Sequence, residues 1–68
     1  MKQVSGRELA RAVTRKGWSL ARINGSHHIF VKEGQRERLV IPLHGNRPLK
    51  VGLLRYLMKM APLDEDEI

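Results

Sequence analysis

Apolar residues near the start of the chain recur at the spacing of a helix. Leu9, Ala12 and Val13 lie three or four positions apart or side by side, so they fall on one helical face. Ser5 stands three residues before Glu8, and this pair forms a capping box in which each side chain accepts a hydrogen bond from the other residue's backbone. The pattern therefore predicts a helix that begins directly after Ser5.

The same segment predicts where this helix ends and what its outer face carries. Gly17 can adopt the left-handed conformation that commonly closes a helix, and the stem of Lys16 is expected to complete the buried stripe. Arg7, Arg11 and Arg15 recur every four residues, which places them together on another face. We expect one face of the helix to pack and the other to be cationic.

A strand and a hairpin are predicted next. Residues 18–23 alternate weakly, with Leu20 and Arg22 expected on one side of a strand and Ala21 on the other. The dipeptide Asn24-Gly25 then gives a strong hairpin signal, because both residue types tolerate a positive φ.

Two further strands complete a predicted meander. The second is expected from about residue 27 to 32 and the third from residue 37 to 41, with a turn at residues 33–35 between them. Pro42 has no N–H group to donate to a sheet, so it is expected to end the third strand.

A second helix is predicted over residues 50–60, after a loop. Leu54, Leu57, Met58 and Ala61 lie at i, i+3, i+4 and i+7, which is the spacing of one buried helical stripe. The chain is therefore expected to be an α+β protein of order α-β-β-β-α. Its three-stranded antiparallel sheet is expected to be covered on one face by the two helices.

The charge is unevenly distributed along the chain. Asp64, Glu65, Asp66 and Glu67 fall within the last five residues, so the body through Ala61 carries thirteen bases and three acids, a net charge of +10. Such an excess favours an anionic partner. We expect a single domain over residues 1–63 and an acidic tail over residues 64–68, which either serves solubility alone or competes weakly with that partner.

The composition also excludes several classes of protein. The chain has no cysteine, so it forms no disulfide and no thiolate metal site. No segment approaches the roughly 20 apolar residues that cross a bilayer, and residues 1–10 lack the apolar core of a secretory signal. A soluble, cytoplasmic protein without membrane association is expected.

Two adjacent histidines follow the hairpin signal. In a strand, His27 and His28 point to opposite faces, so only one of them is expected to do chemistry. Phe30 shares a face with His28 and is a large apolar anchor, which favours an outward His27. Ile29 and Val31 share the face of His27, and they leave the orientation ambiguous. His28 is interpreted mainly as a structural imidazole.

Five blocks of the sequence are informative in their joint order. They are Ser5-Gly6-Arg7-Glu8-Leu9, Gly17-Trp18, Gly25-Ser26-His27-His28-Ile29-Phe30, Val40-Ile41-Pro42-Leu43-His44-Gly45-Asn46 and Leu49-Lys50-Val51-Gly52-Leu53-Leu54-Arg55. Together they resemble the HicA family of toxins over nearly everything through Leu63. Leu53 departs from the family, in which many members have Thr or Ser there, and the acidic tail lies outside the family pattern.

The resemblance implies both a fold and an activity. The fold would be similar to that of a double-stranded-RNA-binding domain, and the activity would be that of an mRNA interferase neutralised by a HicB-like antitoxin. The family's catalytic histidine is the first one after the Gly-Ser turn, which here is His27. We expect no metal and no small-molecule cofactor.

The expected chemistry is acid–base catalysis on RNA. An imidazole can take the proton of a ribose 2′-hydroxyl, which then attacks the adjacent phosphorus. His44, Lys32 and Lys50 are candidates for the second proton-transfer group. The predicted RNA-binding residues are Gly25, Ser26, Lys32, Arg38 and Lys50. The three cations among them belong to a larger set of basic residues whose individual contacts the sequence does not assign.

Other interpretations of the same residues stay open. The chain could be a non-catalytic RNA-binding module, or a protein whose basic surface docks an acidic protein partner. A Ser26–His27 nucleophile pair is disfavoured, because adjacent residues in a strand diverge and no orienting acid lies nearby. A metal site of His27, His28 and His44 is disfavoured for the same geometric reason.

Overall fold

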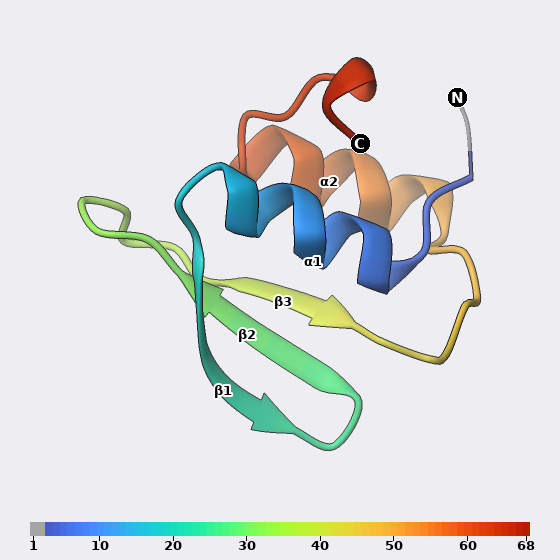
Figure 1. Cartoon of the computed structure of the whole chain (residues 1–68), viewed down its shortest axis with the longest axis horizontal. Helices are drawn as coiled ribbons and strands as arrows, with labels where there is room; N and C mark the ends of the chain where they lie inside the picture. Colours follow the sequence, from blue (N-terminus) through green and yellow to red (C-terminus); the bar gives the residue numbers. More distant parts are fainter. Residues whose placement is uncertain (1–2) are drawn as a thin grey trace.

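The computed structural model describes residues 3–68 and has the predicted order of elements (Figure 1). The elements are α1 (Gly6–Arg15), β1 (Ser19–Asn24), β2 (His27–Val31), β3 (Leu39–Pro42), α2 (Val51–Met60) and a short 3-10 helix, η1 (Glu65–Glu67). The strands form one antiparallel sheet in the order β1-β2-β3, and both helices lie on the same side of it. The predicted α+β fold is confirmed.

Local sequence signals account for both ends of α1. The Ser5 hydroxyl accepts from the Glu8 N–H at 3.2 Å, and the Glu8 carboxylate accepts from the Ser5 N–H at 3.1 Å, so the capping box is complete. At the other end Gly17 has φ +99°, and the N–H of Trp18 donates to the carbonyl oxygen of Val13 at 3.0 Å. This Schellman motif confirms the role predicted for Gly17.

The hairpin between β1 and β2 turns one residue later than the sequence suggested. Asn24 is paired with His27, so Gly25 and Ser26 are the two loop residues. Gly25 has φ +62°, whereas Ser26 has no positive φ, which is the pattern of a type II′ turn with glycine at its first central position. His27 is therefore the first residue of β2.

A β-bulge in β1 overturns the alternation expected for that strand. Leu20 pairs with Phe30 and Arg22 pairs with Ile29, so Ala21 is an extra residue without a partner in β2. Because neighbouring residues of β2 face opposite ways, Leu20 and Arg22 also lie on opposite faces of the sheet. The prediction that they share one side is wrong.

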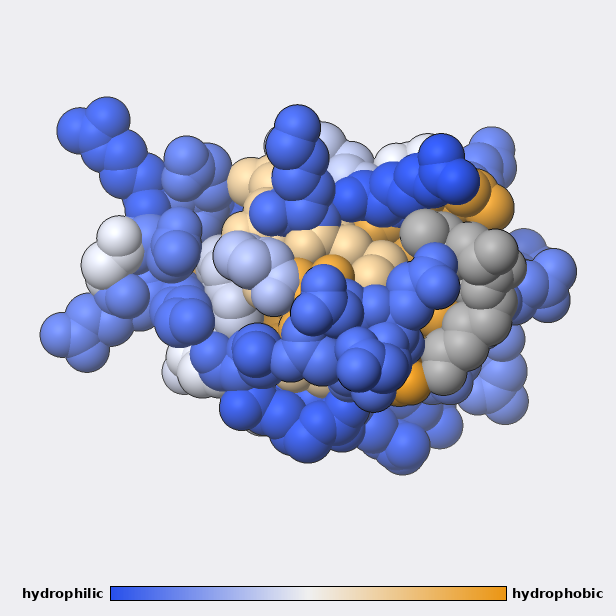
Figure 2. Space-filling model, turned by 90° about the horizontal axis from the view of Figure 1, so that it is seen from above, coloured by the Kyte–Doolittle hydropathy of each residue, from blue (hydrophilic) through white to orange (hydrophobic). Residues whose placement is uncertain are grey.

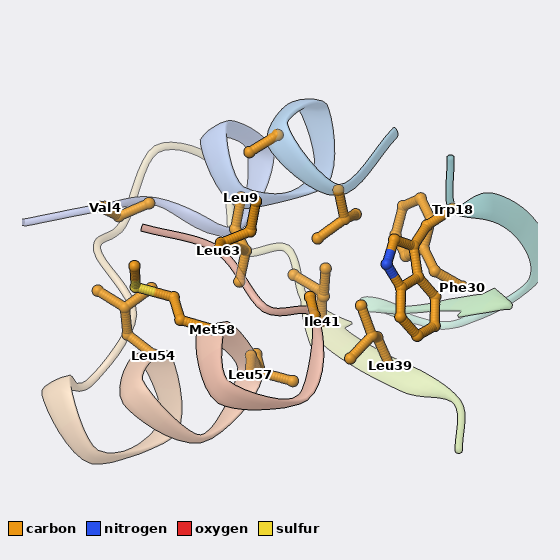
Figure 3. Close-up of a cluster of buried hydrophobic side chains, with 13 residues drawn as sticks. Val4, Leu9, Trp18, Phe30, Leu39, Ile41, Leu54, Leu57, Met58 and Leu63 are labelled. Atoms are coloured by element: carbon orange, nitrogen blue, oxygen red, sulfur yellow. The ribbon is translucent and has the colours of Figure 1, made fainter. Parts of the chain in front are cut away.

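The hydrophobic core fills the space between the helices and the sheet (Figure 3). The stripe predicted for α2 is confirmed, since Leu54, Leu57, Met58 and Ala61 are all buried. The other buried residues of the core are Val4, Leu9, Ala12, Val13, Trp18, Phe30, Leu39, Ile41 and Leu63. This core holds the position of β2 and therefore of the histidines at its start.

The helices cover the sheet unequally. Both α1 and α2 lie against β3, whereas β1 lies away from the two helices (Figure 1). On the helix side of β1, Leu20 is 47% exposed and Ile23 is 56% exposed. The uncovered strand leaves apolar surface beside α1.

The loop after β3 packs tightly against the start of α1. A Cβ added to Gly6 would collide with the carbonyl oxygen of Pro42, and the N–H of Leu49 donates to the carbonyl oxygen of Val4 at 2.7 Å. Ser5 and Pro48 form an isolated antiparallel bridge. The N-terminal segment, the end of β3 and the loop before α2 are thus joined at one end of the sheet.

The acidic C-terminal segment folds back onto the end of α1. Lys16 Nζ lies 2.6 Å from Glu67 Oε2, and Arg15 Nη2 donates to the Glu67 carbonyl oxygen at 3.0 Å. The side chain of Lys16 is 43% exposed, so the prediction that its stem is buried is wrong. This contact raises the pKa of Lys16 and lowers that of Glu67, in both cases mainly through their shared hydrogen bond.

Candidate functional site

His27 is held at the tip of the β1–β2 hairpin by pairing on both sides. It lies opposite Asn24 in β1 and opposite Pro42 in β3, so the backbone of its strand is fixed from two directions. Its side chain is exposed. The structure therefore presents the His27 imidazole to solvent from a backbone that is paired on both sides.

The burial of Phe30 settles the orientation of the two histidines. Phe30 is only 4% exposed and faces the helices, so His28, two residues before it, faces the same side. His27 points to the opposite, open face of the sheet. His28 is half-buried, and within the described residues its Nδ1 atom has no hydrogen-bond partner. The two imidazoles occupy different environments.

Gly25 and Ser26 shape the approach to His27. An added Cβ at Gly25 would meet nothing within 4 Å, so a ligand can approach the backbone of the turn closely. The carbonyl oxygen of Ser26 accepts from the N–H of Leu43 at 2.8 Å. This hydrogen bond ties the turn to the loop that follows β3.

A basic pocket of about 290 Å³ lies at the same end of the sheet. It is lined by Pro42, His44, Arg47, Pro48, Leu49, Lys50 and Leu53. Pro42 connects it to the site, because this residue pairs with His27. Two of the three candidates for a second proton-transfer group, His44 and Lys50, therefore line one pocket next to the strand pair that holds His27.

The remaining predicted RNA-binding residues lie elsewhere. Lys32 follows the last residue of β2, and Arg38 precedes the first residue of β3, so both are at the end of the sheet opposite the hairpin. Lys32 stands five positions after His27, which in an extended strand is a span of roughly 17 Å. The structure groups Gly25, Ser26 and Lys50 with His27 and leaves Lys32 and Arg38 apart.

Two residues near His27 carry a significance that the sequence pattern did not show. The hairpin signal predicts Asn24 as a turn residue, whereas the structure places it in β1 directly across from His27. Arg22 pairs with Ile29, which places its side chain on the open face with His27. Only the bulge at Ala21 brings Arg22 to that face, and no residue in β1 signals the bulge.

In residues 3–68, no group of three or more histidine and acidic side chains is placed to hold a metal ion. Over the same range, no helix has the length and apolar character needed to traverse a bilayer.

The fold and the site define a small basic α+β protein with one exposed histidine at a hairpin tip. Residues 6–63 match the model of a family described as HicA toxin of bacterial toxin-antitoxin systems. A search among curated proteins gave no significant match. Because the match covers most of the chain, this protein belongs to the HicA toxin family, and that membership implies an antitoxin partner.

Proposed function

We propose that this toxin is an endoribonuclease that cleaves mRNA with His27 as its general acid or base. The observation that carries the proposal is the position of His27, which is exposed on the open face of the sheet at a backbone paired on both sides. A catalytic imidazole needs both access to substrate and a fixed orientation. Of the two adjacent histidines, only His27 has its side chain exposed.

The proposed reaction uses the nucleophile that RNA itself carries. The His27 imidazole takes the proton of a ribose 2′-hydroxyl, and the oxygen attacks the adjacent phosphorus. The bond from phosphorus to the 5′-oxygen breaks, which leaves a 2′,3′-cyclic phosphate and a 5′-hydroxyl. The leaving 5′-oxygen takes a proton from a second group, for which His44 or Lys50 in the adjoining pocket is proposed.

Positive charge near His27 supports the same proposal. Lys50 and Arg47 line the pocket that shares Pro42 with the His27 strand pair, and Arg22 lies on the same open face as His27. Such groups stabilise the extra negative charge that develops on phosphorus. Gly25 and Ser26 are proposed to approach a phosphate through the backbone of the turn, and Lys32 and Arg38 to contact RNA farther along the sheet.

The proposal is tested with an RNA and a DNA of equal sequence, incubated with wild-type protein and with His27→Ala. We expect wild type to cleave only the RNA, because DNA lacks the 2′-hydroxyl, and to leave cyclic phosphate ends. His27→Ala should keep the wild-type circular dichroism spectrum and lose cleavage. Products with a 5′-phosphate and a free 3′-hydroxyl would contradict the mechanism.

A binding experiment separates this activity from a non-catalytic RNA-binding module. If about six cations contact phosphates, RNA affinity should fall by roughly three decades between 50 and 200 mM salt. A wild-type protein that binds RNA in this way but leaves it intact, with and without added metal ions, would select the binding module.

The remaining parts of the proposal are a HicB-like antitoxin as the partner and action in the cytoplasm, where mRNA is translated.

A further inference from the structure

A second recess lies on the helix side of the sheet, away from His27. It is a groove of about 450 Å³ between α1 and the helix-facing side of β1, and we call it the α1–β1 groove. Its rim is formed by Arg7, Arg11, Thr14 and Arg15, and its floor by Ala10, Leu20 and Phe30. It exists because the helices lie against β3 and leave β1 uncovered (Figure 1).

The floor of the groove is aliphatic surface that solvent can reach. Leu20 is 47% exposed there, whereas Phe30 is only 4% exposed. Phe30 therefore offers no open ring face on which a nucleic-acid base could stack. An aliphatic side chain placed against Leu20 and Ala10 would remove apolar surface from water, which is favourable in proportion to the area covered.

The rim of the groove is strongly cationic. Arg7, Arg11 and Arg15 stand one helical turn apart along it, and none of the described residues that line the groove is acidic. Within the described residues, neither Arg7 nor Arg11 forms an ion pair. Figure 2 looks onto the outer side of the helices, where hydrophilic side chains surround a smaller area of apolar surface; the α1–β1 groove itself lies between α1 and the sheet. The groove therefore combines anion recognition with an apolar floor.

The chain's own C-terminal segment shows which chemistry suits this end of α1. Arg15, the last arginine of the rim, donates to the carbonyl oxygen of Glu67, and the carboxylate of Glu67 pairs with Lys16. Ile68, the next residue, is half-buried and packs against the core. An acidic segment with an aliphatic residue is thus already held at the C-terminal end of α1, where Arg15 contacts this segment and also lines the groove.

We propose that the α1–β1 groove binds an acidic peptide segment with aliphatic side chains, supplied by the antitoxin. The carboxylates would pair with Arg7 and Arg11, and the aliphatic side chains would cover Leu20. An RNA backbone could pair with the arginines, but it has no aliphatic group for the floor. The inference depends on membership in a toxin-antitoxin family and not on RNA cleavage, since the groove and His27 lie on opposite faces of the sheet.

The experiment measures binding of three probes to the full chain. They are a short peptide of alternating glutamate and leucine, a matched peptide of glutamate and serine, and an RNA of equal net charge. Amide chemical-shift mapping should place the glutamate–leucine peptide at Ala10 and Leu20 rather than at the hairpin. The glutamate–serine peptide should bind at least about tenfold more weakly, because it leaves the floor uncovered.

Variants with matched controls test the two halves of the groove. Arg11→Glu should weaken binding of the glutamate–leucine peptide about tenfold, whereas Arg55→Glu, on the exposed side of α2, should change it less than about twofold. Leu20→Ser should weaken it about fivefold. Its control is Val40→Ser, at a strand position with a similar exposed fraction of 43%. If Leu20→Ser misfolds, the chemical-shift map of the wild type shows whether the peptide binds at Ala10 and Leu20.

Several outcomes would overturn the inference. Equal binding of the two peptides would show that the apolar floor plays no part, and equal weakening by Arg11→Glu and Arg55→Glu would show unspecific charge attraction. Chemical shifts from RNA alone at Ala10 and Leu20 would make the groove an RNA surface. His27→Ala should bind the peptide as wild type does, and Leu20→Ser should still cleave RNA, so this inference and the proposed nuclease activity fail separately.

Discussion

The open face and the helix-covered face of one sheet give two adjacent histidines opposite surroundings. His27 faces solvent beside Arg22 and the basic pocket, whereas His28 faces the helices with a buried ring nitrogen. The residue type and the strand are the same, so the difference arises from the pleat and from the core that anchors Phe30. The reactivity proposed for His27 therefore depends on which face of the sheet its side chain takes.

The largest expected effect comes from removing the exposed imidazole. His27→Ala should lower the rate of RNA cleavage by about 10² to 10⁴-fold, the usual contribution of positioned acid–base catalysis. Its unfolding midpoint in urea should stay close to wild type, since an exposed side chain adds little packing. If His27→Ala retains most of the cleavage rate, His27 is not the catalytic group, and the proposed difference in reactivity between the two faces is wrong.

The next effect is expected where the start of α1 meets the end of β3. Gly6→Ala should lower the free energy of unfolding by about 1–3 kcal/mol, because the added methyl group collides with the backbone of Pro42. It should also slow cleavage, since Pro42 is the strand partner of His27. Chemical denaturation and initial rates provide the two measurements.

Gly52→Ala is the matched control for that substitution. Gly52 lies in the first turn of α2, and an added Cβ would meet nothing within 4 Å. Alanine there should raise the free energy of unfolding by up to about 1 kcal/mol, because it removes the flexibility of glycine from a helix. Equal destabilisation by both substitutions would show that the contact with Pro42 has no special role.

A smaller effect of opposite sign is expected at His28. His28→Leu should stabilise the protein by about 1 kcal/mol, because it replaces a buried nitrogen that lacks a hydrogen-bond partner by apolar atoms. Cleavage should continue at the wild-type rate. Thermal unfolding and RNA cleavage measure the two outcomes, and a strongly destabilised or inactive variant would give His28 a role that its position on the helix face does not suggest.

The smallest effect concerns the ion pair between the C-terminal segment and α1. The pKa of Glu67 is lowered from 4.5, so the carboxylate contributes stability above that pH and loses it as the pH falls through the lowered value. Glu67→Gln should therefore lower the melting temperature at neutral pH by less than about 4 °C, and the difference should vanish in acid. Glu65→Gln in the same η1 segment is the control.

The helical parts of the fold could be predicted because their signals are local. The capping box at Ser5, the glycine that closes α1 and the apolar stripe of α2 each lie within a few residues, and each is confirmed. The bulge at Ala21 could not be predicted, because it depends on how β1 pairs with β2. A single extra residue there moves Arg22 to the opposite face.

The candidate site likewise combines features that local sequence predicts with features that depend on the tertiary fold. The size of Phe30 favours an outward His27, but Ile29 and Val31 are apolar too, so only the burial of Phe30 in the folded core fixes the orientation. The separation of Lys32 and Arg38 from the hairpin follows from strand ends, which periodicity places poorly. The basic pocket combines residues of β3, the next loop and α2, so only the tertiary fold brings His44 and Lys50 together.

One hydrogen bond joins the two sides of the candidate site. The N–H of Leu43 donates to the carbonyl oxygen of Ser26, so the Leu43 amide exchanges with solvent only when the hairpin tip separates from the segment that leads to His44. Deuterium uptake at the Leu43 amide therefore reports on both at once. Any molecule that clamps the hairpin, whether nucleic acid or protein, slows isotope exchange at this single position, which gives a probe of occupancy without a label on the ligand.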